Sequence, residues 1–177
     1  YFAENWELAA EIMRERGVFT AQNQPKVDTL LPLVALGTVA DVVKLDANNR
    51  RLVAQGLRRI RAGHLPVGLA SLFTAAGRKA NVATTFDFGF ALGPRINAAG
   101  RIADAAMAAE LLAATDETEA RRLVDAIEAL NLERRELDSA TRDEAIAIAD
   151  RLMDADPLAL VVYHPGWHPG VIGITAS

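Results

Sequence analysis

The chain has 177 residues, of which 51% are hydrophobic and 24% charged, with a formal net charge of −4 and no cysteine. This composition is typical of a globular protein, and it excludes a disulfide framework and a thiolate zinc site. No apolar run approaches the roughly 18 residues that span a bilayer, and the N-terminus lacks the layout of a signal peptide, so we expect a cytoplasmic protein without a membrane partner. The chain starts without methionine and stops directly after an apolar stretch, which indicates a fragment.

Hydrophobic spacing predicts a mainly helical chain. In chain order, helices are expected over residues 2–16, 30–43, 48–60, 67–76, 103–113 and 116–153. A further helix is expected to begin near Asp87 with Thr84 or Thr85 as its cap, and to be broken by Gly93 and Pro94. The β-branched stretch LALVVY, residues 158–163, predicts a buried strand.

Asp41 is the only charged residue in the apolar run LLPLVALGTVADVV, residues 30–43. An unpaired carboxylate in such surroundings costs several kcal/mol or loses its charge, so a bare buried Asp41 is not expected. It either surfaces at the end of an element, meets a cation from elsewhere, or ligates a metal ion.

The charge is unevenly distributed. Residues 50–101 carry nine basic side chains against Asp87 alone, whereas the segments on both sides are acidic. Such a block is a candidate footprint for a polyanion, and a solvated helix face is the alternative.

Within the basic block, the segment GPRINAAGR, residues 93–101, is the best candidate for binding phosphate. Its small residues let a ligand approach the backbone, Arg95 and Arg101 can fork onto phosphate oxygens, and Asn97 lies between them. The alternative is a turn whose arginines are solvated or paired with a nearby aspartate. His164 and His168 flank a Pro-Gly-Trp turn, where binding groups are often found, but two histidines without a third ligand are weak evidence for a metal site.

Three segments together resemble one family. LVALGTVADVVKLDANNRRLVAQGLRRIRAG (33–63), FDFGFALGPRINAAGRIADA (86–105) and VVYHPGWHPGVIGITAS (161–177) are similar to the RecJ single-strand-specific exonucleases of the DHH phosphoesterase superfamily. The resemblance implies hydrolysis of single-stranded DNA from the five-prime end, with Mn²⁺ or Mg²⁺ activating water. Asp41 matches a metal ligand of the family; Arg95, Asn97 and Arg101 match DNA contacts, and His168 a residue facing the cleft between domains. The aspartate motif and the Asp-His-His motif of the family are absent, so Asp41 alone cannot hold two ions and the fragment is expected to be inactive.

The resemblance also implies an α/β parent fold, of which this chain is a mainly α-helical part. Residues 1–115 would form the C-terminal part of a DHH domain, 116–156 a long connecting helix, and 157–177 the start of the DHH-associated domain with its first strand. Two alternatives stay open: a different DHH phosphoesterase acting on oligoribonucleotides, cyclic dinucleotides or pyrophosphate, and a non-catalytic helical binding module.

Overall fold

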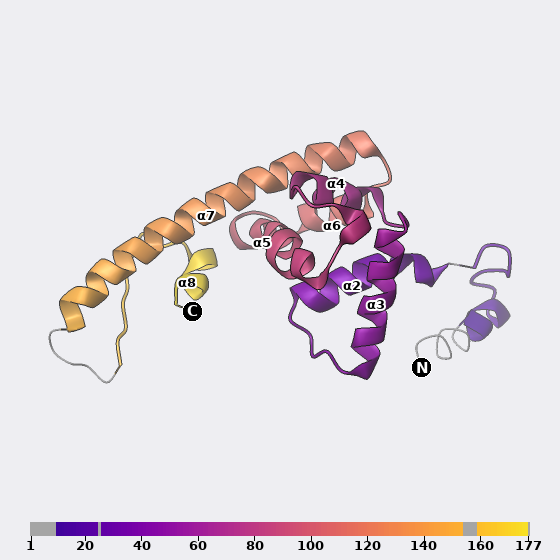
Figure 1. Ribbon diagram of the computed structural model, residues 1–177, viewed down its shortest axis with the longest axis horizontal. Helices are drawn as coiled ribbons and strands as arrows, with labels where there is room; N and C mark the ends of the chain where they lie inside the picture. The colour runs from indigo at the N-terminus through magenta and orange to yellow at the C-terminus, as the bar shows by residue number, and fades with distance from the viewer. Residues whose placement is uncertain (1–9, 25, 154–158, 177) are drawn as a thin grey trace. The chain divides into compact units, whose positions relative to one another are not determined.

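The computed structural model describes residues 10–24, 26–153 and 159–176 (Figure 1). The chain divides into two compact units, Tyr1–Leu30 and Leu31–Ser177. In the first unit, residues 10–15 are helical and Gly17, with φ of 67°, follows the helix end, as the sequence predicted. A single 3₁₀ turn, η1 (Val27–Leu30), closes this unit. The first part of the predicted helix 2–16 lies outside the described residues.

The second unit begins with two crossing helices, α2 (Leu31–Ala40) and α3 (Ala47–Arg61). The Asp46 carboxylate caps α3 by accepting a hydrogen bond of 2.9 Å from the Asn49 N–H. Such a cap satisfies an amide that would otherwise lack a partner in the first helical turn. The buried stripe of α3 is apolar and the arginines of α3 lie on its other faces, so the helix expected over residues 48–60 is formed and is amphipathic.

The elements that follow are also helical. They are α4 (Val67–Ala75), the 3₁₀ turn η2 (Ala80–Val82), the π-helix η3 (Asp87–Leu92), α5 (Gly93–Ile102), α6 (Ala106–Ala113), α7 (Glu117–Met153) and α8 (Pro169–Thr175). The first half of α7 packs against α4, α5 and α6, and its second half extends beyond them to contact α8 (Figure 1). The Asp116 carboxylate caps α7 by accepting a hydrogen bond of 2.9 Å from the Glu119 N–H.

A single apolar core joins α2 to α7. Its largest fully buried side chains include Phe73 and Phe88, whose rings meet edge to face with centroids 6.3 Å apart. The last α7 residue of this core is Ile127. The described residues therefore confirm a mainly helical fold, and no helix among them is both long and apolar enough to cross a membrane.

The predicted break at Gly93 and Pro94 is wrong. The chain is helical without interruption from residue 85 to residue 102, with the π-helix η3 passing directly into α5. Pro94 lies at the start of α5, directly after the π-helix, whose last turn closes through the Gly93 N–H donating to the Phe88 oxygen, so the proline falls where the hydrogen-bond pattern changes from π to α. GPRINAAGR is consequently a helix rather than a turn.

The predicted strand is not formed in the part of it that the structure describes. Residues 159–163 adopt neither helix nor strand, and Val161 and Tyr163 are 89% and 77% exposed. A strand requires a neighbouring strand to complete its hydrogen bonds, and the described residues of this chain provide none.

The crossing of α2 and α3 generates a stability prediction. A methyl group on Gly56 would lie 2.4 Å from both the Leu31 oxygen and the Ala35 Cβ, so Gly56→Ala forces the two backbones apart. We expect a loss of about 1–3 kcal/mol in the free energy of unfolding, measured by chemical denaturation. Gly37→Ala, in α2, is the matched control: a methyl there meets nothing within 4 Å, so it should stabilise the helix by about 0.4–1 kcal/mol. Equal effects at both glycines would contradict the close crossing.

Candidate functional site

Asp41 lies at the end of α2 and is exposed to solvent. Its N–H donates to the Gly37 oxygen at 3.0 Å, whereas its carboxylate makes no hydrogen bond or ion pair with any residue that the structure describes. The Asp41 side chain therefore surfaces at the end of a helix, and pairing with a cation from elsewhere among the described residues is excluded. An exposed, unpaired carboxylate fits one ligand of a hard divalent ion, since Mg²⁺ and Mn²⁺ prefer oxygen donors.

The turn that carries Asp41 is strained. Val42 and Val43 donate to the Val39 and Thr38 oxygens at 3.2 and 3.1 Å, which is the hydrogen-bond pattern of a helix end that requires a left-handed residue. Val42 fills that position with φ of 54°, and it is the one non-glycine with positive φ in the described part of the chain. A β-branched residue in this region costs roughly 1–2 kcal/mol, and strain of this kind gathers at functional sites.

Three other helical segments end with the same hydrogen-bond pattern but carry glycine. Gly17, Gly63 and Gly77 have φ between 64° and 83°. The amide after each donates to an oxygen five residues earlier, as the amide of Val43 does after Val42. The turn beside Asp41 therefore has the same backbone geometry as these three helix ends, but it carries valine where they carry glycine.

No group of three or more His, Cys, Asp or Glu side chains that could hold a metal ion occurs among the described residues. Asp41 is thus a ligand candidate only together with donors from elsewhere.

Arg95 faces α7. Its Nε pairs with the Glu128 carboxylate and its Nη1 donates to the Ala91 oxygen at 2.7 Å, while only 19% of the side chain is exposed. The alternative in which this arginine is solvated or pairs with a nearby aspartate is therefore not what the structure shows. Asp87 instead accepts from Thr84 and lies 3.5 Å from the Arg78 Nε.

Asn97 and Arg101, one helical turn apart on α5, share a surface groove. The groove has a volume of about 410 Å³ and is lined by Ile96, Asn97, Gly100, Arg101, Ala105 and Ala108. Both polar side chains are exposed, so a ligand in the groove meets an amide and a guanidinium together. The structure brings Asn97 and Arg101 together, whereas the contacts of Arg95 lie toward α7.

His168 joins this group from α8. As the N-cap, its Nδ1 accepts from the Gly170 N–H at 3.0 Å, which leaves Nε2 as the protonated nitrogen of a neutral ring. The Arg101 Nη1 donates to the Gly170 oxygen at 3.1 Å. Gly170 therefore connects both side chains, and a methyl group on it would lie 2.1 Å from the Arg101 oxygen. His164 accepts from the Gly166 N–H at 3.2 Å, as expected for a hydrogen-bonded turn.

Arg134, on α7, is a residue that sequence reasoning missed. Its Nη2 donates to the Asn131 Oδ1 at 3.0 Å, while its buried Nε has no hydrogen-bond partner in the described structure. Burial lowers the pKa of Arg134 and Asp138 opposes this effect, while Arg101 adds a neighbouring positive charge. The signal in the sequence was its position: Arg134 interrupts the apolar seam of α7 between Leu130 and Leu137.

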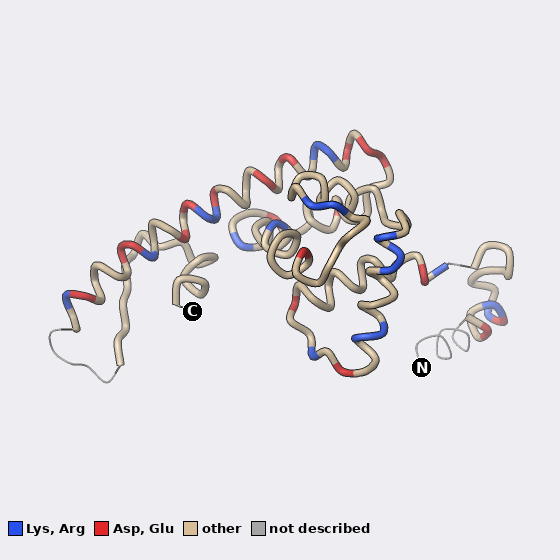
Figure 2. Tube along the Cα trace, in the orientation of Figure 1, with Lys and Arg blue, Asp and Glu red and all other residues tan. Residues whose placement is uncertain are grey.

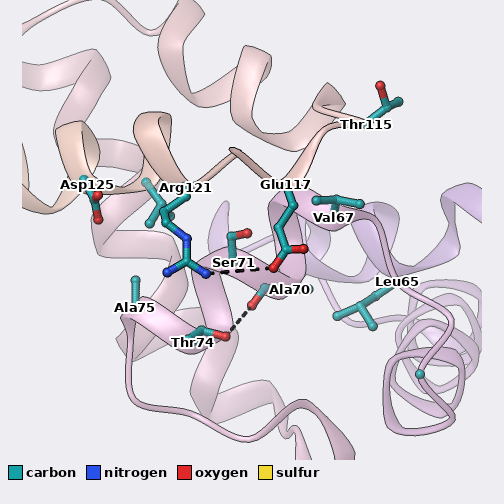
Figure 3. Close-up of a pocket in the computed structure, with 12 residues that line it drawn as sticks. Leu65, Val67, Ala70, Ser71, Thr74, Ala75, Thr115, Glu117, Arg121 and Asp125 are labelled. Atoms are coloured by element: carbon teal, nitrogen blue, oxygen red, sulfur yellow. Dashed lines mark hydrogen bonds and ion pairs between the residues drawn. The ribbon is translucent and has the colours of Figure 1, made fainter. Parts of the chain in front are cut away.

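The basic residues of α3, of the segment after α4 and of α5 have no acidic residue on the same elements, whereas α7 carries both acidic and basic residues along its length (Figure 2). A larger hollow of about 630 Å³ lies between α4 and the start of α7. It is flanked by the exposed ion pair of Arg121 and Glu117, 3.9 Å apart, and by a Thr74 hydroxyl that donates to its own helix (Figure 3). It contains none of the residues predicted for the site.

Known proteins with similar sequences identify the class of protein to which these residues belong. No family model matches the chain. Among curated proteins, the single-stranded-DNA-specific exonuclease RecJ of Dickeya dadantii is 48% identical over 170 residues, and that of Escherichia coli is 46% identical; each match covers 93% of this chain and 30% of the relative. The Thermus thermophilus relative is 40% identical over 145 residues.

Solved structures agree. The crystal structure of RecJ with Mn²⁺ from Thermus thermophilus matches with a TM-score of 0.75 and 37% identity over 88% of this chain and 23% of that chain. The Mg²⁺ complex matches with a TM-score of 0.73. In both sequence and fold, the chain therefore matches a segment of single-strand-specific exonucleases. The matched exonucleases are RecJ proteins, which confirms the resemblance seen in the sequence. The chain spans about 30% of the length of the curated relatives from Dickeya dadantii and Escherichia coli.

The strained turn beside Asp41 can be tested directly. Val42→Gly removes the steric cost of the left-handed conformation, so we expect the free energy of unfolding to rise by about 1 kcal/mol, by chemical denaturation. Val43→Gly is the control, because Val43 does not have positive φ and glycine there only adds freedom to the unfolded chain. A Val42→Gly variant no more stable than the wild type would contradict the strain.

Proposed function

We propose that this chain is part of a metal-dependent exonuclease that hydrolyses single-stranded DNA from the five-prime end in DNA repair and recombination, in the cytoplasm. Residues 1–115 are assigned to the rear of a DHH phosphoesterase domain, 116–156 to a connecting helix and 157–177 to the start of the DHH-associated domain. The chain by itself is proposed to be inactive, because the other metal ligands that the resemblance implies are absent from it.

The observation that carries the proposal is the Asp41 turn. Its carboxylate is exposed, has no partner among the residues described, and follows a helix end held in an unfavourable conformation. The match to RecJ proteins over 93% of the chain supports the same assignment. Mn²⁺ or Mg²⁺, the ions in the matching RecJ structures, would supply a Lewis acid and an activated water for phosphodiester hydrolysis.

The groove on α5 is assigned to the DNA strand. Asn97 and Arg101 are exposed in the same hollow, and His168 offers its Nε2–H from the neighbouring α8. A guanidinium and an imidazole N–H are both suitable donors for phosphate oxygens. Arg95 keeps a supporting part in this proposal: Glu128 and Ala91 occupy its Nε and Nη1, and its Nη2 is left for a phosphate.

Replacing the proposed metal ligand tests the catalytic assignment. In the complete protein that carries this chain, Asp41→Asn keeps the size of the side chain but removes its charge, so metal-dependent release of nucleotides should fall at least about a hundredfold. Asp143→Asn, an exposed aspartate on α7, should leave the rate unchanged. An unaltered rate in Asp41→Asn would exclude the ligand role.

Salt dependence tests the DNA groove. Each phosphate contact on a single strand contributes about 0.7 to the slope of log K against log salt concentration, so Arg101→Ala should weaken binding of an oligothymidylate and lower the slope by about that amount. Arg122→Ala serves as the control, because Arg122 pairs with Glu119 at 2.7 Å on an exposed part of α7. A slope that is the same for Arg101→Ala and the wild type would show that Arg101 does not contact phosphate.

A further inference from the structure

Two phenylalanines form an exposed stacked pair on the π-helix. The rings of Phe86 and Phe90 lie 4.7 Å apart between centroids, with an interplanar angle of 25°, and the residues are 56% and 73% exposed. The other two phenylalanines of this part of the fold, Phe73 and Phe88, are no more than 1% exposed. Two large aromatic rings left in water while their neighbours are buried indicate a surface that binds something.

Phe86 immediately precedes the π-helix and Phe90 lies within it. Residues four apart share nearly the same face of an α-helix or a π-helix, so the two rings stack on one side while Phe88 enters the core. Single π turns inside α-helices are frequently found at functional sites.

A cation stands beside the rings. The Arg78 guanidinium carbon lies 5.9 Å from the Phe86 ring centroid, and Lys79 follows it in the chain. Asp87, which is 8% exposed, accepts from Thr84 and pairs with Arg78 at 3.5 Å, so the two cations together exceed the one carboxylate by a single positive charge. The surface therefore combines flat aromatic faces with positive charge, which suits a flat base attached to a phosphate.

The helical segment that carries the pair packs against the end of α2. A methyl group on Gly89 would lie 3.9 Å from the Val39 Cγ1, and one on Gly93, at the start of α5, would lie 3.3 Å from the Ala40 Cβ. The two residues approached are those that immediately precede Asp41 in the chain.

We propose that Phe86 and Phe90 form a stacking platform for an unpaired nucleobase of the DNA strand. The inference rests on the proposed function and adds to it a residue pair that selects single strands, because a base inside a duplex does not present its face. Phe90, the more exposed ring, contacts the base, and Phe86 supports it from beneath together with Arg78.

Abasic oligonucleotides test the platform in the complete protein. Binding is measured in the presence of a metal chelator, so that the strand is not hydrolysed. The ligands are a series of oligothymidylates, each with a single abasic site at a different position. In the wild type, one position should weaken binding by about tenfold. Phe90→Leu, which keeps an apolar side chain but no ring, should weaken binding to the intact strand by a similar factor and show no further loss at that position. Phe90→Trp should restore the difference.

Controls separate the possible failures. Leu132→Ala truncates a side chain that is 57% exposed on α7, and it should bind like the wild type. If the Phe90→Leu protein lost as much affinity as the wild type at the sensitive abasic position, the platform would be overturned while the proposed function stood. A lowered melting temperature with unchanged binding would also overturn it, by showing that other protein covers the rings. A wild type that neither binds nor degrades single strands would overturn the proposed function and this inference together.

Discussion

Direct contact between helix backbones at three glycines determines how the second unit is assembled. A methyl group would lie 2.4 Å from a backbone oxygen of another helix at Gly56, 1.7 Å at Gly68 and 2.1 Å at Gly170. Larger side chains would separate the helices, because close-packed interiors accommodate added atoms poorly. The candidate site depends on one of these contacts, because Gly170 holds α8 against the end of α5, and on the small size of Gly93, where a methyl group would lie 3.3 Å from the Ala40 Cβ at the end of α2.

Much of the helical architecture could be predicted from the sequence. Local signals were sufficient where the periodicity was clear: the apolar spacing of residues 116–153 predicted the long helix α7, which Asp116 caps. The exposed position of Asp41 is one of the three situations that the cost of burying a lone charge left open. These features depend on residues within one or two helical turns, which is why a single sequence contains them.

The remaining features depend on geometry that spacing does not encode. Gly93 and Pro94 look like a break, but their effect depends on the π-helix before them, and the proline falls where the hydrogen-bond pattern changes from π to α. The partner of Arg95 is a glutamate 33 residues away, and Arg134 reaches the neighbourhood of Arg101 only through the packing of α7 on α5. Val42 gave no sign of its conformation, since nothing in its side chain favours positive φ.

The exposed segment before α8 has a consequence for handling the chain. Leu160, Val161 and Tyr163 are 38%, 89% and 77% exposed, and residues 159–163 adopt neither helix nor strand. Apolar, β-branched stretches with unsatisfied amides and carbonyls are templates for intermolecular strand pairing. Unless another strand covers this segment, concentrated solutions of the chain will aggregate through it, and a charged residue at Val161 will act as a gatekeeper.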